Sequence, residues 1–166
     1  MSILSDIVRV SKAAINEINK PESYVKGDAF ESYIRSYLFV KDRYNLIQKT
    51  HDYTTNKGDF VENTKEPDFK FRCIKTNREF FVEAKYRSAY YDNAIEWCKA
   101  FQLKRYKEID KKTPVYLTLG VGNEPDSPTQ VFFIPLKDIK YTKLFRSFLK
   151  DYEVSSKSPV EHRLLK

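Results

Sequence analysis

The sequence contains little glycine and little cysteine, and each shortage excludes a class of protein. Only 4 glycines in 166 residues exclude a loop-dominated or fibrous architecture. The two cysteines, Cys73 and Cys98, have no Cys-x-x-Cys spacing, which indicates a reduced chain without a structural zinc site. No apolar run approaches the roughly eighteen residues of a membrane span, and the N-terminus lacks the apolar run of a signal peptide. We therefore expect an intracellular, cytoplasmic protein with no membrane partner.

What the chain has in excess is positive charge. Its 30 Lys and Arg residues against 23 Asp and Glu residues give a net charge of +7 and a pI near 9.2. This surplus favours a polyanion as partner, because cations that neutralise phosphates release counterions. The 12 Tyr and 12 Phe residues add to this, since aromatic rings between cations can stack on bases. DNA is the partner that we expect.

The length and the apolar pattern predict one domain. At 166 residues the chain can build one hydrophobic core but not two comfortable ones. We divide it into an N-terminal helix packing on the core (1–25), a main domain (26–154) and a polar, loose C-terminal tail (155–166). The periodicity predicts helices and strands in the order α-α-β-β-β-α-β-β-α, over residues 3–19, 26–40, 44–50, 68–74, 79–86, 94–109, 114–121, 131–134 and 141–150. The fold class is α/β, with a central mixed sheet flanked by helices.

A predicted β-hairpin carries the charged residues that point to chemistry. Residues 79–86 alternate so that Glu83 and Lys85 share one face, and residues 68–74 form the partner strand. A tight turn between them places Asp68 opposite Glu83, or within a residue or two of it. Directly opposed like charges destabilise a sheet, and a divalent cation between the two carboxylates would remove that penalty.

The same residues suit phosphodiester hydrolysis. A metal-bound water that attacks phosphorus needs a cation, a nearby amine and charge stabilisation on the phosphate. Asp68, Glu83 and the Ala84 carbonyl can supply oxygen ligands to the cation, and Lys85 can supply the amine. Glu31 on the preceding helix can complete the coordination, directly or through water.

This constellation resembles the PD-(D/E)XK nuclease superfamily. Pro67-Asp68 matches its first acidic motif and Glu83-Ala84-Lys85 its E-x-K motif, while Glu31 lies where many members carry a helical acid. Gln102 to Tyr106 is similar to the Q-x-x-x-Y element of RecB-like members. The resemblance covers about residues 27–121 and implies a restriction-endonuclease-like αβββαβ core. It also implies Mg²⁺-dependent hydrolysis of DNA, with Mn²⁺ as a substitute, and a role for Gln102 in orienting the site or contacting phosphate.

Basic and aromatic residues near these motifs are candidate contacts to nucleic acid. They lie directly after the E-x-K strand or on the helix of Gln102: Tyr86, Arg87, Lys104, Arg105 and Tyr106.

Each part of the pattern also has a plain structural reading. Glu83 with Lys85 suits a solvated strand face, Asp68 a turn, Glu31 an exposed helix position, and Gln102 with Tyr106 the edge of an amphipathic helix. Acids before the hairpin could serve a second metal or belong to a solvated loop (Asp59, Glu62 and Glu66). The two histidines, His51 and His162, are surface residues in our interpretation.

Three functions remain open on sequence alone. The first is a metal-dependent deoxyribonuclease, endo- or exonuclease. The second is a catalytically idle module that binds nucleic acid or joins a larger assembly, because this short chain shows no partner domain. The third is a structural α/β domain. A homodimer would suit symmetric cutting of a four-way junction, but no dimer surface is identifiable in the sequence.

Overall fold

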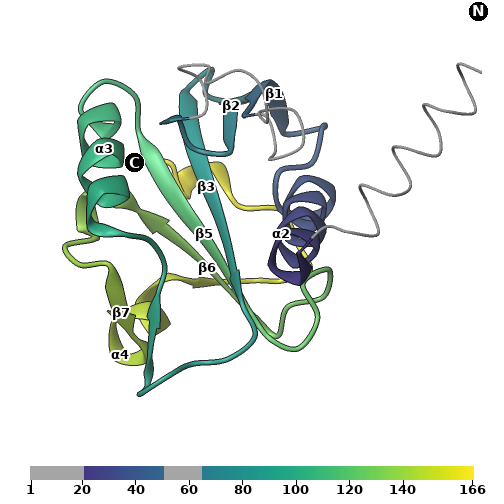
Figure 1. The fold of residues 1–166 in the computed structure, drawn as a ribbon. Coiled ribbons are helices and arrows are strands. Elements are labelled where there is room, and N and C mark those ends of the chain that lie inside the picture. The colour runs from purple at the N-terminus through teal and green to yellow at the C-terminus, as the bar shows by residue number, and fades with distance from the viewer. Residues whose placement is uncertain (1–20, 51–64) are drawn as a thin grey trace, which may run out of the picture.

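The computed structural model describes residues 21–50 and 65–166 (Figure 1). The helix expected at 3–19 lies outside these ranges, as do Asp59, Glu62 and His51. The elements are α2 Glu22–Tyr33, η1 Ile34–Leu38, β1 Tyr44–Lys49, β2 Phe69–Cys73, β3 Glu79–Arg87, β4 Ala94–Glu96, α3 Ala100–Asp110, β5 Val115–Val121, β6 Gln130–Pro135, η3 Leu136–Asp138, β7 Lys143–Phe145, α4 Arg146–Leu149, η4 Lys150–Tyr152, β8 Glu153–Val154 and η5 His162–Leu164. In the described ranges, no helix has the length and apolarity to cross a membrane.

A mixed six-stranded sheet forms the centre of the molecule, as the sequence predicts. Its strand order is β1-β2-β3-β5-β6-β8, and only the β3–β5 pair among its neighbours is parallel. Helix α3 makes the crossover that a parallel pair requires. Every residue of β5 is buried, which explains why its sequence is almost continuously apolar. Helices α2 and α3 lie on opposite faces of this sheet (Figure 1).

The hairpin β2–β3 has the register that the sequence predicts. Phe69 pairs with Val82 and Arg72 with Glu79, so the same register continued by one step sets Asp68 opposite Glu83. The connecting turn is tight because Asn77 adopts a left-handed conformation, with φ 57°, that asparagine tolerates. The alternation of β3 directs Phe81, Glu83 and Lys85 toward the α3 side.

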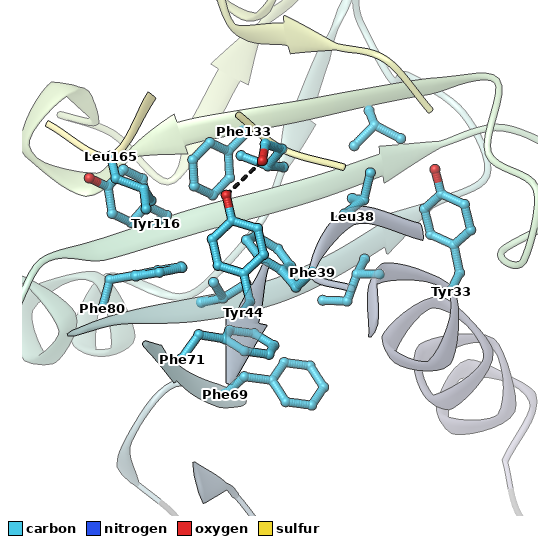
Figure 2. Close-up of a cluster of buried hydrophobic side chains, with 14 of the residues drawn as sticks. Tyr33, Leu38, Phe39, Tyr44, Phe69, Phe71, Phe80, Tyr116, Phe133 and Leu165 are labelled. Carbon is cyan, nitrogen blue, oxygen red and sulfur yellow. Dashed lines mark hydrogen bonds between the residues drawn. The ribbon is translucent and has the colours of Figure 1, made fainter. Parts of the chain in front are cut away.

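An aromatic core fills the space between the sheet and α2 (Figure 2). The rings of Tyr116 and Phe133 stack with centroids 4.6 Å apart, and Phe39 stacks on Phe71 at 4.8 Å. The Tyr44 hydroxyl donates a hydrogen bond of 2.6 Å to the Val160 carbonyl, the dashed line in Figure 2. This core fixes α2, and therefore Glu31, against the sheet.

The C-terminal segment is part of that core, and our expectation of a loose tail at 155–166 is wrong. Val160 and Leu165 are buried, and the Val160 N–H donates to the Leu38 carbonyl. The Arg78 guanidinium and the Tyr116 hydroxyl bind the carbonyls of Leu165 and Lys166. A few apolar anchors therefore hold a mostly polar segment in place.

Our prediction of a helix over residues 94–109 is also wrong for the first residues of that range. Ala94–Glu96 is strand β4, which pairs with β7, and the helix begins only at Ala100. Asp92 and Asn93 both have positive φ and form a two-residue turn before β4, which starts a strand rather than a helix. Trp97 and Cys98 are buried, whereas Phe101 is exposed. The helix expected at 141–150 is likewise split into β7, α4 and part of η4.

Glycine at position 120 allows α2 to approach the sheet, and this gives a test of the packing. A Cβ at Gly120 would lie 2.3 Å from the Phe30 ring, on the helix that carries Glu31. We expect Gly120→Ala to lower the free energy of unfolding by about 1–3 kcal/mol in urea titrations, because the packed ring must move. Gly27→Ala on the same helix is the control, because its Cβ would meet no atom within 4 Å. Equal stability of Gly120→Ala and wild type would contradict this account.

Candidate active site

Asp68 lies where β2 begins and where the neighbouring chain holds it from two sides. Its carboxylate oxygen Oδ2 accepts a hydrogen bond of 2.8 Å from the Ala84 N–H. Its own carbonyl accepts from the Thr50 N–H at 2.9 Å, and the Thr50 hydroxyl donates to the Pro67 carbonyl at 2.7 Å. These bonds fix the Asp68 side chain against β3.

Glu83 is a buried acid with one uncompensated oxygen. Its side chain is only 3% exposed, and Oε1 lies 2.6 Å from the Lys85 Nζ. The other oxygen, Oε2, is buried and has no hydrogen-bond partner among the described residues. A buried carboxylate oxygen without a hydrogen-bond partner is costly, which makes it the strongest local sign that the site fits a cation, although the Tyr106 hydroxyl also lies close to this carboxylate.

The electrostatics of the three residues are coupled. Burial, followed by the negative charge of Glu83, raises the pKa of Asp68 well above its ordinary value. Burial lowers the pKa of Lys85, but the negative charges of Glu83 and Asp68 outweigh it, so that its pKa is raised overall. At neutral pH Lys85 is therefore an ammonium, and it offsets the charge of the acids beside it.

The backbone between Glu83 and Lys85 offers one more oxygen. The Phe81 N–H donates to the Pro114 carbonyl, so the backbone N–H and C=O groups of Phe81 point toward β5. Backbone groups alternate along a strand, so those of Ala84, three residues later, point the other way, toward β2. The β2–β3 register ends at Phe69 and Val82, and continued by two steps it sets Pro67 opposite Ala84. Proline has no N–H, so it cannot donate to the Ala84 carbonyl. The Pro-Asp pair therefore leaves this carbonyl free of a ladder partner and supplies the adjacent carboxylate.

Glu31 approaches the same place from α2. A cavity of about 640 Å³ is lined by Glu31 together with Asp68, Ala84 and Lys85. Burial raises the pKa of Glu31, and the charges of Asp28 and Glu83 add to this against the opposing effect of Lys49. The Lys49 Nζ lies 3.2 Å from Glu31 Oε2. Sequence reasoning missed Lys49, which only its position at the end of a predicted strand could have suggested.

The donors present here fit a hard divalent cation. Asp68, the orphaned oxygen of Glu83 and the Ala84 carbonyl are all oxygens, the ligand type that Mg²⁺ and Mn²⁺ prefer. No three Asp, Glu, His or Cys side chains of residues 21–50 and 65–166 converge closely enough to hold a metal alone. The candidate metal ligands are therefore two carboxylates and one carbonyl, whereas Glu31 forms an ion pair with Lys49.

Comparison with known proteins supports the same conclusion about the fold. No protein-family model and no curated sequence matches this chain. The solved structure of Hjc, a Holliday junction resolvase from the archaeal hyperthermophile Archaeoglobus fulgidus, superposes with a TM-score of 0.53 and 15% identity, over 78% of this chain and 91% of the resolvase chain. The chain has the fold of this resolvase. The resemblance read from the Pro-Asp and E-x-K motifs is confirmed at the level of the fold.

The two ends of the Q-x-x-x-Y element expected from the sequence have different environments. The Gln102 side-chain oxygen accepts the Lys99 N–H at 3.0 Å and caps its own helix. Tyr106 is buried, its ring stacks on Trp97, and burial followed by the charges of Glu83 and Asp68 raises the pKa of its hydroxyl. Tyr106 therefore lies behind the acids as part of the wall of the site, whereas Gln102 is engaged elsewhere.

The other expected nucleic-acid contacts differ in accessibility. Tyr86 is buried, with its hydroxyl bound to the Gly122 carbonyl, and only its edge reaches the cavity. Arg87 lines the cavity and donates to the carbonyls of Tyr86 and Glu96. Lys104 is exposed on α3, and Arg105 is half-buried with its guanidinium 5.4 Å from the Tyr106 ring. Arg87 and Lys104 remain available to a ligand, whereas Tyr86 and Tyr106 are core residues.

Among the described residues, neither a reactive cysteine nor His162 belongs to this site. Cys98 is buried, and burial followed by the charge of Glu83 raises its pKa to about 11, so it stays a thiol at neutral pH. His162 lies on η5, and Glu66 accepts a hydrogen bond from Gln48 on the edge strand β1. The acids and the lysine of the hairpin therefore remain the candidate reactive groups.

Proposed function

We propose that this protein is a metal-dependent nuclease that hydrolyses phosphodiester bonds of DNA. The observation that carries the proposal is one arrangement. The β2–β3 register, continued by one step, sets Asp68 opposite Glu83, which contacts Lys85, and both Asp68 and Lys85 line a cavity of about 640 Å³. A buried glutamate next to a partly buried aspartate and a lysine has a high electrostatic cost, which a protein retains for a functional reason. The PD-(D/E)XK nuclease fold gives this arrangement its context.

DNA is the substrate that the molecule fits best. The net charge of +7 favours a polyanion, and Arg87 joins Lys85 in the lining of the cavity. The structural neighbour Hjc is a Holliday junction resolvase, so a four-way junction belongs among the substrates to be tested. Two symmetric cuts would require a homodimer, or a larger assembly, in which each copy contributes one site.

The chemistry follows from the groups that line the cavity. When bound, Mg²⁺ or Mn²⁺ would lower the pKa of a water molecule and offset charge on the phosphate. Asp68, Glu83 and the Ala84 carbonyl would hold that ion, and Glu31 would act through water. The Lys85 ammonium can orient the attacking water and donate a hydrogen bond to the phosphate oxygen on which charge develops. Tyr106, buried beside Glu83 and stacked on Trp97, limits access of water to this acid from the α3 side.

A substrate panel tests the proposal directly. Linear, circular, single-stranded, flap and four-way-junction DNA, with RNA as comparison, would be incubated with Mg²⁺, Mn²⁺ or EDTA. We expect cleavage of DNA with either metal and none in EDTA. If no form of DNA or RNA is cut with either metal, the proposal fails.

One observation favours a second candidate, a binding module without catalysis. Glu83 and Glu31 already have cationic partners, Lys85 and Lys49, so the acids are partly compensated without a metal. Calorimetric titration with Mn²⁺ separates the two candidates. A working site binds Mn²⁺ in wild type, loses it in Asp68→Ala and keeps it in the control Asp151→Ala, whose side chain is exposed on η4. DNA binding without Mn²⁺ binding would favour the module.

A further inference from the structure

A second cavity adjoins the candidate active site on the outer side of α2. It has a volume of about 560 Å³ and lies between η1, the link to β1 and the end of β1. Glu31 lines both cavities, so the two meet at this residue. The side chains of Arg35, Lys41 and Lys49 bring three positive charges to the second cavity, against the acids Glu31 and Asp42.

Two of these cations have no anionic partner in the part of the chain that the structure describes. Within residues 21–50 and 65–166, no carboxylate forms an ion pair with Arg35 or Lys41. Lys49 does pair with Glu31 at 3.2 Å, although its side chain is 43% exposed. Unpaired cations that share a cavity repel one another, and an anion bound between them would remove this cost.

A rigid element holds one wall of this cavity. The η1 segment is a π-helical turn in which the Phe39 N–H donates to the Ile34 carbonyl at 2.7 Å, a rare geometry that often occurs at functional sites. Ile34, Leu38 and Phe39 are all buried in the aromatic core. These buried side chains therefore hold in place the backbone segment to which Arg35 belongs. Lys41 lies on the short link that follows η1.

From this arrangement we infer that the cavity binds a backbone phosphate of the DNA strand that enters the candidate active site. The inference rests on the proposed function and adds the direction in which the strand leaves the site, along η1 toward the start of β1. The Arg35 guanidinium can donate two parallel hydrogen bonds to a phosphodiester, and Lys41 adds a point charge. We name this cavity the η1 groove. Its contacts are to phosphate and sugar, so it carries no sequence preference.

Binding measured without cleavage tests the η1 groove separately from catalysis. The affinity of the full chain for a fluorescently labelled DNA duplex would be measured in EDTA over a series of salt concentrations. Each phosphate contact that is lost reduces the slope of log K against log salt by about 1. At about 0.1 M salt, that change in slope corresponds to a loss of about tenfold in affinity for each cation. We therefore expect Arg35→Met with Lys41→Met to bind about 100-fold more weakly, with the slope reduced by about 2.

Matched variants decide what a loss of binding means. Lys137→Met is the control, because Lys137 is an exposed lysine on η3, which packs near α3 on the other side of the sheet. Lys41→Arg keeps the charge and should keep the slope. Phosphate binding by the η1 groove is contradicted if the double variant keeps the wild-type affinity and slope, or if Lys137→Met loses as much affinity. It is also contradicted if the wild type binds no DNA. If the double variant loses affinity while wild type cuts nothing with Mg²⁺ or Mn²⁺, the groove stands and the nuclease proposal fails.

Discussion

Replacing Lys85 with alanine is expected to lower Mg²⁺-dependent cleavage of DNA by about 10³-fold while the sheet remains folded. Among the residues that the structure describes, its ammonium group is the one cation that forms an ion pair with Glu83, 2.6 Å from Oε1, and its side chain is 25% exposed beside the cavity. Loss of one well-placed donor to a developing negative charge costs about 10²–10³-fold in rate, and the loss of positive charge adds to this. Single-turnover cleavage with saturating Mg²⁺ measures the effect.

Lys70 provides a matched control on the neighbouring strand. Its side chain is 23% exposed, lies on the same face of the sheet and forms an ion pair with Glu79 at 2.9 Å. Lys70→Ala therefore removes a comparable lysine and should leave the cleavage rate within about twofold of wild type, because surface pairs of this kind contribute little. Equal losses in both variants would mean that Lys85 acts only through the stability of the sheet.

The same substitution has a separate effect on stability. Lys85→Ala leaves Glu83 buried without its cation, so the free energy of unfolding in EDTA should fall by about 1–3 kcal/mol. Adding Glu83→Gln removes the uncompensated charge and should restore part of that stability. Cleavage should remain absent in the double variant. Recovery of stability without recovery of activity would separate the chemical role of this pair from its structural role.

The sequence predicted the hairpin well because local rules determine it. The alternation in 79–86 specifies which side chains share a face, and the short turn leaves little freedom in register, so Asp68 and Glu83 had to meet. The buried strand 115–121 and the strand ended by Pro135 were equally clear from their apolar runs. The Pro-Asp and E-x-K motifs are local in the same sense, and the comparison confirms the fold that they indicated.

Two long-range contacts and one local helix cap determine the features that we did not predict from the sequence. The pair between Lys49 and Glu31 joins an edge strand to a helix, and no spacing within either element indicates it. Gln102 has the right spacing from Tyr106 to face the site, but its amide satisfies the free backbone N–H at the start of its own helix. The segment 94–96 became a strand because β7, nearly fifty residues later, pairs with it.

Replacing Asp68 with asparagine should have opposite effects on stability with and without metal. Without metal, the raised pKa of Asp68 means that the folded state holds its proton more tightly than the unfolded state, whose carboxyl titrates near 3.9. This contribution to stability is complete below about pH 3.9 and is lost as the pH rises through the folded pKa. At pH 7.5 wild type therefore carries a destabilising charge that asparagine lacks, while the asparagine oxygen can still accept the Ala84 N–H. In EDTA we expect Asp68→Asn to melt at a higher temperature than wild type.

Metal should reverse that order, because the ion binds the folded wild type and not the variant. At about 100 times its dissociation constant, Mg²⁺ or Mn²⁺ would stabilise wild type by about 2.7 kcal/mol. That corresponds to about 5–10 °C in melting temperature for a chain of this size. Asp68→Asn should show almost no shift with metal, whereas the exposed control Asp151→Asn should follow wild type under both conditions. Thermal unfolding between pH 4 and 8, with EDTA or metal, measures the difference between wild type and variant. A difference that is independent of both pH and metal would show that Asp68 is only a turn residue.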